Sequence, residues 1–353
     1  MFHAGRLLAL SDAGKPWELD PHTLTTIGAC SLDGALSRIG RYSPHPRVDA
    51  TTGELFNFGI DVVPRLLPKL PLGLRCYRTS PDGHTRSIAT IPLDGAHIQH
   101  DFAITEKFLV FLISPITVDP WKALTQPQEL AAQWHRDKPT RVILVPRNGG
   151  QMAEYTLDEP LAYVHIVNAY QDDLGVHVDL VRFPDPDDFF VPTRQFRTST
   201  RAVGGCTTRV TIAPSGTISL RDINARRYEL PQYDWRRAGL PYTYGYYTTL
   251  RSTPETPNEI YKVDHTTGTE QRLQFAPGDV PGEPFFVPRT DAVAEDDGWL
   301  LTQVTSGGCT SLHIIDARNI HDGPVATAAG PTGFFPGFHG SFTRTRPGDR
   351  TPR

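Results

Sequence analysis

Hydrophobic residues along the chain fall mostly in short runs that polar turns separate. The clearest run covers residues 108–112 (Phe-Leu-Val-Phe-Leu), and it is too short for a core helix. Its aromatic and β-branched residues predict a buried strand. The polar stretch just before it contains His97, His100 and Asp101. A histidine beside a buried strand is held rigidly, as a metal ligand must be, although capping of a turn is the simpler interpretation.

Units of a strand followed by a polar turn recur along the chain. Residues 5–10 predict a strand, residues 11–14 a turn, and residues 17–27 the next element, the second strand of a β-meander unit. Weaker copies occur at 260–268 and 312–318. Such repeats are typical of β-propeller blades. The irregular spacing excludes a WD40 or kelch array and predicts long loops between the strands.

Three segments depart from this pattern. Residues 120–134 have the spacing of a helix. Residues 62–74 are rich in leucine, with basic residues between them and three prolines that exclude a regular helix. We interpret this segment either as an insertion folded over the sheets or as a lip that contacts a membrane. The basic tail 343–353 is expected to be disordered.

Composition narrows the class of protein. The chain has 353 residues, and 39% of them are hydrophobic. Its 32 prolines and 30 glycines are scattered along the chain, as turns between many short strands require. This spacing predicts an all-β fold. A net charge of −4 gives no basic surface for nucleic acid, so no nucleic-acid partner is expected. We find no apolar run of membrane-spanning length and no secretory signal pattern. The predicted location is cytoplasmic, with peripheral membrane association through 62–74 left open.

The four cysteines do not indicate a metal site or a disulfide framework. They are far apart and have no CxxC spacing. Reduced thiols are the expected state.

Four of the 13 histidines lie in dense local contexts, far apart in sequence. They are His45, His100, His165 and His339. No linear metal motif has such spacing, but a propeller brings residues from several blades to its axis. Neutral imidazoles suit first-row metals such as Fe, Cu, Zn and Ni. Two single acids in apolar surroundings, Glu229 and Glu283, are candidates for the carboxylates that accept a hydrogen bond from metal-bound histidines.

At these residues the chain resembles the carotenoid cleavage oxygenases. The resemblance rests on residues 282–289 (Gly-Glu-Pro-Phe-Phe-Val-Pro-Arg) with 294–299, on 100–106, on 44–55, on His165 with Asn168, and on 338–342. These motifs occur in the family's order, and the resemblance covers about residues 5–342.

The resemblance implies an all-β, seven-bladed β-propeller whose long loops form a dome over the substrate. It implies a non-haem Fe(II) held by His45, His100, His165 and His339. Glu229 and Glu283 would support two of these ligands, and Asp12 would take the position of a third glutamate. Because Asp is one methylene shorter, its contact with His100 is expected to be stretched or mediated by water.

A second departure lies at the start of the chain. The family has a substantial segment before the strand at 5–10. We therefore expect a single, N-terminally truncated domain over 1–342, with an incomplete first blade and an open strand edge near 5–10.

The reaction that the resemblance implies adds O2 across a conjugated C=C bond of an apolar polyene and gives two carbonyl products. Aromatic residues beside the motifs are candidates for a substrate tunnel, with core packing as the alternative: Tyr170, Phe285, Phe286, Phe334, Phe335 and Phe338. Relatives that cleave hydroxystilbenes have a lysine where this chain has Ser11. A carotenoid or apocarotenoid substrate is therefore favoured. The alternatives are a stilbene-cleaving dioxygenase and an inactive, truncated propeller, and the retinoid isomerisation of one branch of the family is left open.

Overall fold

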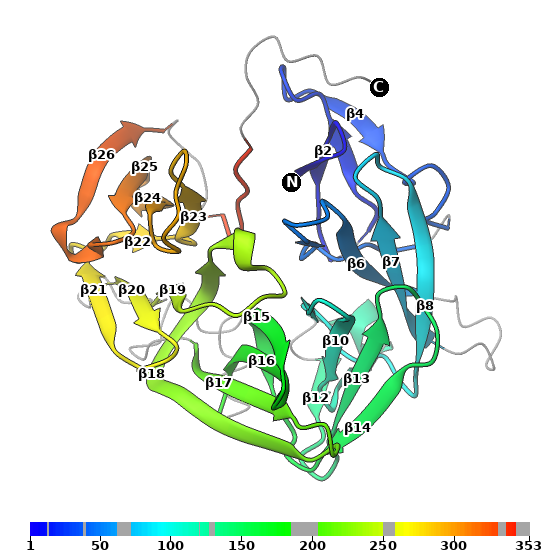
Figure 1. Cartoon of the computed structure of the whole chain (residues 1–353). Coiled ribbons are helices and arrows are strands. Elements are labelled where there is room, and N and C mark those ends of the chain that lie inside the picture. The colour runs from blue at the N-terminus through cyan, green and yellow to red at the C-terminus, as the bar shows by residue number, and fades with distance from the viewer. Residues whose placement is uncertain are drawn as a thin grey trace. The chain divides into compact units, whose positions relative to one another are not determined.

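The computed structural model describes residues 1–12, 14–37, 40–61, 72–119, 121–126, 131–184, 204–249, 258–330 and 337–343. The chain divides into two compact units, Met1–Pro160 with Ser341–Arg353, and Leu161–Gly340. Strands dominate both units (Figure 1), and the helices of the described residues are three-residue 3-10 turns. The predicted all-β class is confirmed. Residues 62–71 of the segment predicted at 62–74, Phe334, Phe335 and residues 344–353 of the predicted tail lie outside the described residues.

The first unit is built from antiparallel meanders. Its first sheet consists of β1 (Phe2–His3), β2 (Arg6–Ala9), β3 (Trp17–Leu19) and β4 (Thr26–Ala29). The second consists of β5 (Arg47–Val48), β6 (Leu55–Asp61), β7 (Leu72–Thr79) and β8 (Thr85–Leu93). The third has the order β14 (Ala153–Leu157), β13 (Thr140–Pro146), β10 (Phe108–Ile113) and β9 (Ala103–Ile104). Four-stranded meanders of this kind are typical of propeller blades.

The strand predicted at 108–112 is confirmed as β10. Its residues Leu109, Val110, Phe111 and Leu112 have no exposed surface. Strand β10 lies between β9 and β13, so its backbone is paired on both edges. His100 and Asp101 lie just before β9, the short strand that pairs with one edge of β10.

The continuous helix predicted over 120–134 is not found in the described part of this segment, residues 121–126 and 131–134. The 3-10 turn η1 (Lys122–Leu124) is followed by strand β12 (Ala132–Trp134), which pairs with β11 (Ile116–Val118). The Asp119 side chain accepts hydrogen bonds from the amides of Trp121 and Lys122 at 2.9 and 3.2 Å, which favours a single tight turn. Pairing with β11 thus outweighs the helical spacing of the side chains.

The strand predicted at 5–10 is β2, and it does not itself carry the open edge that was expected near it. Strand β2 pairs with β1 on one side and with β3 on the other. The terminal amine of Met1 also donates to the Leu8 carbonyl at 2.7 Å. The incomplete first blade and the single domain over 1–342 stay predictions.

The second unit holds a seven-stranded and a five-stranded antiparallel sheet. The first comprises β15 (Tyr163–Asp172), β16 (Gly175–Arg182), β17 (Gly205–Ile212), β18 (Ile218–Tyr233), β19 (Tyr244–Thr248), β20 (Glu259–Asp264) and β21 (Glu270–Gln274). The second comprises β22 (Val280–Pro281), β23 (Phe285–Pro288), β24 (Gly298–Ser306), β25 (Cys309–Asp316) and β26 (Pro324–Ala329). Two further 3-10 turns are η2 (Trp235–Arg237) and η3 (Ile320–Asp322).

Strand β18 is the longest element of the described residues and belongs to two successive meanders. Its first part, up to Tyr228, pairs with β17, and its last part, from Glu229, pairs with β19. It therefore joins β15–β17 and β19–β21 into one continuous sheet.

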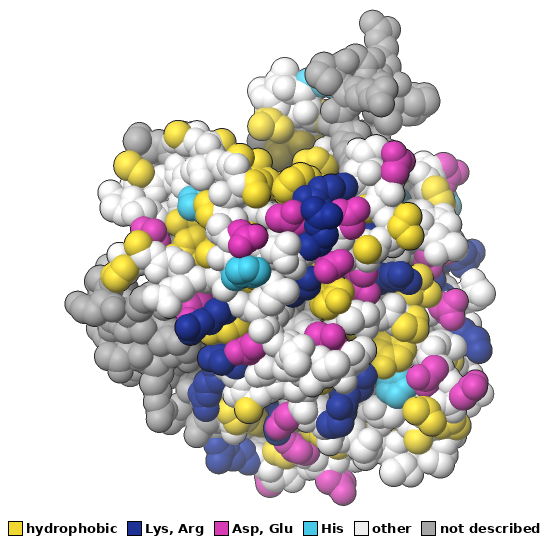
Figure 2. Space-filling model, turned by 60° about the vertical axis from the view of Figure 1, so that its left-hand side comes forward, with side chains coloured by type: hydrophobic (Ala, Val, Ile, Leu, Met, Phe, Trp, Pro, Cys, Tyr) yellow, Lys and Arg dark blue, Asp and Glu magenta, His cyan; other side chains and the backbone are white. Residues whose placement is uncertain are grey.

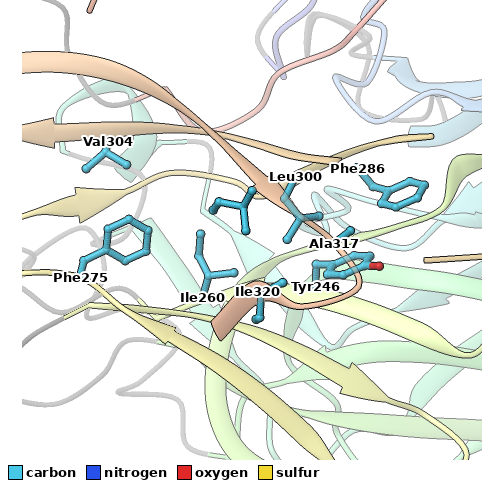
Figure 3. Packing of buried hydrophobic residues seen from close by; sticks show 9 residues of the cluster. Tyr246, Ile260, Phe275, Phe286, Leu300, Val304, Ala317 and Ile320 are labelled. Atoms are coloured by element: carbon cyan, nitrogen blue, oxygen red, sulfur yellow. The ribbon is translucent and has the colours of Figure 1, made fainter. Parts of the chain in front are cut away.

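One hydrophobic cluster fills the core between the two sheets of the second unit (Figure 3). The ring of Phe286 stacks on that of Tyr246 with centroids 5.6 Å apart and planes 8° from parallel. Ile260, Leu300 and Ile315 pack in the same cluster, and all three are fully buried. Burial of this apolar surface is the main stabilising term for such a sheet pair.

Charged side chains of both signs are interleaved on the surface. Figure 2 shows Lys and Arg side chains among Asp and Glu side chains on the face in view. Arg289 pairs with Asp297 at 2.7 Å and Arg318 with Asp316 at 2.9 Å. The described residues include no helix with the length and apolar character needed to cross a lipid bilayer.

Candidate metal centre

In the first unit, two of the four predicted histidines face each other. His45 lies just before β5 and His100 just before β9. Their Nε2 atoms are 2.8 Å apart and their ring centroids 4.4 Å. This places two potential ligand atoms, 55 residues apart in sequence, beside one point.

Ser43 fixes the backbone at both histidines. Its hydroxyl accepts from the His45 amide at 3.2 Å and donates to the His100 carbonyl at 3.2 Å. The buried side chain of Asn57, on β6, donates to the Ser43 carbonyl at 2.9 Å. These bonds attach both histidine loops to the β5–β8 sheet.

An ion pair links the residues that follow each histidine. The Arg47 guanidinium donates to both carboxylate oxygens of Asp101, at 2.9 and 2.7 Å, and its Nε donates to the Phe102 carbonyl at 3.0 Å. The Asp101 side chain is almost fully buried. A bidentate, buried pair of this kind holds a fixed geometry.

Asp12 makes a direct contact with His100. Its Oδ2 atom lies 3.1 Å from His100 Nδ1. The Asp12 side chain is 59% exposed, so water competes for its oxygens. It is the longest of the three contacts between a predicted ligand histidine and its carboxylate, which is the direction expected for the shorter Asp side chain.

In the second unit, His165 lies on β15 and contacts Glu229 on β18. The distance from His165 Nδ1 to Glu229 Oε2 is 2.5 Å, and both side chains are buried. The same oxygen accepts from the Leu230 amide at 2.6 Å. Irregular pairing of β15 with β16 on both sides of Ile166 rotates this part of the strand locally.

His339 contacts Glu283 in the same unit. Glu283, in the connection between β22 and β23, accepts from His339 Nδ1 at 2.9 Å and from the Gly340 amide at 2.8 Å. Gln232, on β18, donates to the same Glu283 oxygen as His339 does, at 2.6 Å. Glu229 and Glu283 thus each contact one of the four predicted histidines, and their role as supports of metal ligands stays a prediction.

The contacts with the glutamates indicate which ring nitrogen of His165 and of His339 carries the proton. A carboxylate only accepts, so the Nδ1 atoms of His165 and His339 must carry the proton. The Nε2 atoms, 3.1 Å apart, then face each other with lone pairs. Two lone pairs aimed at one place can bind a single cation. The donor set of neutral imidazoles backed by carboxylates fits a first-row metal ion.

The aromatic residues predicted to line a tunnel lie in different surroundings. Phe286 is fully buried in the core cluster, which favours core packing for this residue. Tyr170 stacks on His177 with centroids 4.7 Å apart, and partial burial raises the pKa of its hydroxyl. Phe285 is half-buried on β23, and Phe338 is largely exposed. For Tyr170, Phe285 and Phe338 the tunnel role stays a prediction.

Sequence reasoning missed the residues that hold the ligands in place. Ser43, Arg47, Asp101 and Gln232 carry no metal-binding signature. One signal for Gln232 was present, because Pro231 precedes it. A proline within a strand that is paired on both sides indicates a bulge, and bulges re-aim side chains.

Comparison with known proteins gives consistent matches. The family model described as "Retinal pigment epithelial membrane protein" matches residues 1–344. The apocarotenoid-15,15'-oxygenase of Synechocystis sp. is 32% identical over 334 residues, which are 91% of this chain and 67% of that relative. The lignostilbene-alpha,beta-dioxygenase isozyme III of Sphingomonas paucimobilis is 25% identical over 371 residues, with 97% and 73% coverage.

Solved structures match over nearly the whole chain. A cobalt-substituted apocarotenoid oxygenase of Synechocystis has a TM-score of 0.84 at 31% identity. The match covers 98% of this chain and 74% of that one. The chain thus spans about two thirds to three quarters of the length of these matched proteins.

Proposed function

Because the chain belongs to the carotenoid cleavage oxygenase family, that of the retinal pigment epithelial membrane protein, we propose that it cleaves a conjugated C=C bond of a carotenoid or apocarotenoid with O2. The matches confirm three predictions made from the sequence: the family, the β-propeller fold and the class of oxygenase enzymes. The count of seven blades stays a prediction.

The observation that carries the proposal is the facing pair His165 and His339. Each ring is oriented by its own glutamate, so that both Nε2 lone pairs point to one place. His45 and His100 form a second facing pair. We propose that all four bind one Fe(II), as the family resemblance implies. When bound, this ion supplies the redox chemistry that allows O2 to react with the substrate.

The residues of the chain have separate roles in this proposal. The four imidazoles are neutral ligands, so the ion keeps its 2+ charge. Glu229 and Glu283 hold a proton on the Nδ1 atoms of His165 and His339, which keeps each Nε2 atom available. Ser43 and the pair of Arg47 with Asp101 hold the loops of His45 and His100. Aromatic side chains such as Phe285 would hold the polyene and exclude water.

Substrate choice follows from two observations. The relative with the higher identity is named as an apocarotenoid oxygenase, and the one with the lower identity as a lignostilbene dioxygenase. Ser11, next to Asp12, provides no cation to favour a phenolate. Cleavage of stilbenes is the second candidate function.

A direct experiment distinguishes these alternatives. The purified protein is loaded with Fe(II) under anaerobic conditions, mixed with an apocarotenal or with lignostilbene, and exposed to ¹⁸O2. We expect labelled aldehyde products from the apocarotenal. Products from lignostilbene alone would establish the second function. Stoichiometric iron binding without either product would indicate an inactive propeller, and a His165→Ala variant serves as the metal-free control.

Two further predictions concern location and partners. Contact of residues 62–74 with a membrane, in an otherwise cytoplasmic protein, is tested by co-sedimentation with anionic liposomes before and after Leu66, Leu67 and Leu70 are changed to Ser. Absence of binding by the parent would rule the contact out. No nucleic-acid partner is expected.

A further inference from the structure

A β-bulge on β18 aims two side chains at the two glutamate–histidine pairs of the second unit. Glu229 is opposite Thr248 on β19, and Gln232 is opposite Tyr246. Moving three residues along β18 thus corresponds to moving two residues along β19, so β18 has one extra residue between these two pairs. In a regular strand, residues three apart point to opposite faces. The extra residue restores a common face, so Glu229 reaches His165 while Gln232 reaches Glu283.

The bulge has a strained backbone at its centre. Leu230 is buried and has φ of 52°, in the left-handed region that non-glycine residues rarely adopt. Its amide donates to Glu229 Oε2 at 2.6 Å. Pro231, which follows, has no amide to pair with β19. Such strain persists only where neighbouring contacts hold it, and it concentrates at functional sites.

The two histidine–glutamate pairs differ in how the backbone supports them. His165 and Glu229 are both on strands, β15 and β18. Glu283 lies between β22 and β23, and His339 lies outside the strands of the described residues. Backbone pairing in a sheet therefore orients the first pair directly. The second pair depends on side-chain contacts.

Gln232 provides the contact that joins the second pair to a strand. Its amide nitrogen is 2.6 Å from Glu283 Oε1, the oxygen that also accepts from His339. Because a carboxylate can only accept, the Gln232 side chain must present its NH2 group. The Gly340 amide holds the other oxygen. Glu283 is thus fixed from three directions by donors, and Gln232 is the one that comes from β18.

We propose that Gln232 is a positioning residue of the metal centre, which orients His339 through Glu283 and aligns it with His165. The proposal rests on the metal site of the proposed function and assigns a role to a residue that contacts neither metal nor substrate. Outer partners of metal-bound histidines typically contribute 10–100-fold to affinity. Since Gln232 acts through Glu283, we expect an effect at the lower end, about tenfold.

The test is titration of the metal-free protein with Co(II). Gln232→Met removes the donor at nearly constant volume, and Gln232→Glu places a second carboxylate against Glu283. We expect the Co(II) dissociation constant to rise about tenfold for Met and further for Glu. The visible absorption bands of bound Co(II) should shift at saturation, because His339 is reoriented. The matched control is Gln274→Met, at an exposed position of β21, and it should behave as the parent.

A double-mutant cycle separates positioning from a general effect on folding. In a Glu283→Gln background, Gln232→Met should add almost nothing, because the path through Glu283 is already broken. Thermal unfolding of each metal-free variant shows that it is folded. Equal affinity and equal bands for the parent and both Gln232 variants would overturn the inference and leave the metal centre intact. No Co(II) binding by the parent would overturn the proposed metal centre itself, and the inference with it.

Discussion

The Nε2 atoms of His165 and His339 lie 3.1 Å apart, and the Nδ1 atom of each ring contacts a different glutamate. Both lone pairs are therefore held toward one place before any cation arrives. A cation that binds there does not require either ring to reorient. The structural cost of metal binding should accordingly be small in this unit.

The first prediction is that metal binding stabilises the protein. A ligand that binds only the folded state at 100 times its dissociation constant adds about 2.7 kcal/mol to the free energy of unfolding. We expect Co(II) or anaerobic Fe(II) to raise the melting temperature of the parent. The His165→Ala variant should show no rise, as measured by thermal unfolding. A rise of equal size in this variant would place the metal elsewhere.

The second prediction concerns Glu229. In the Glu229→Gln variant the new amide can present NH2 to His165 Nδ1, which favours the tautomer that carries its proton on Nε2. The lone pair facing His339 is then lost, and metal affinity should fall 10–100-fold. Iron content after dialysis against a chelator measures this loss. Glu154→Gln, at an exposed strand position in the other unit, is the control and should retain the iron of the parent.

The third prediction ranks Asp12 below the glutamates. Its side chain is 59% exposed and its contact with His100 measures 3.1 Å, so water can replace it. Asp12→Ala should weaken metal binding less than Glu283→Gln does. Asp12→Glu should strengthen binding if the longer side chain closes the contact. Titration with Co(II) measures both, and a loss from Asp12→Ala as large as that from Glu283→Gln would contradict the ranking.

The fourth prediction assigns Phe286 to the core. Its ring is fully buried against Tyr246, so Phe286→Ala leaves a cavity and should lower the free energy of unfolding by about 3–5 kcal/mol. Denaturant unfolding measures this change. Phe338→Ala, at an exposed position, should change stability by no more than about 0.5 kcal/mol. If Phe286→Ala instead altered product choice at unchanged stability, the side chain would have to line the substrate path.

The fifth prediction is a dependence of stability on acid pH through Asp179. Burial raises the pKa of this carboxyl, but hydrogen bonds from Arg209 and His265 outweigh burial and hold the pKa well below its usual value of 3.8. The contribution of Asp179 to stability is thus complete above pH 3.8 and is lost as the pH falls through the lower pKa of the folded state.

Asp179→Asn tests this assignment. The variant should be less stable than the parent at neutral pH, and its stability should change less as the pH falls below 3.8. Urea unfolding midpoints measured across this range provide the comparison. Asp222→Asn, at a more exposed carboxylate that pairs with Arg182, is the control and should keep the slope of the parent. Parallel curves for the parent and Asp179→Asn would contradict the role of Asp179.

The sequence predicted those parts of the protein that depend on local patterns or on distinctive motifs. Residues 108–112 were recognisable as a strand because a continuous apolar run is buried on both faces. Glu229 and Glu283 were recognisable because isolated acids in apolar surroundings need partners. For residues 120–134 the sequence pattern was misleading, because the apolar spacing suits a helix. The pairing of β12 with β11 depends on residues outside that segment.

For Gln232 the sequence offered only the indirect signal of Pro231, for a different reason. A neutral amide has no charge that needs a partner, and its contact with Glu283 follows a bulge in which Leu230 has a left-handed backbone. Phe286 could not be assigned from its type, because core packing and a tunnel wall call for the same aromatic ring. In both cases the decisive information is the position of a partner far away in the sequence.

The continuity of β18 also determines how the second unit can open. The strand leaves β17 at Tyr228 and joins β19 at Glu229, so the two meanders meet at the residue that orients His165. Neither can detach without disturbing the backbone of the other. Amide hydrogens on β17, β18 and β19 should therefore exchange with solvent as one cooperative unit, and metal occupancy should slow all of them together.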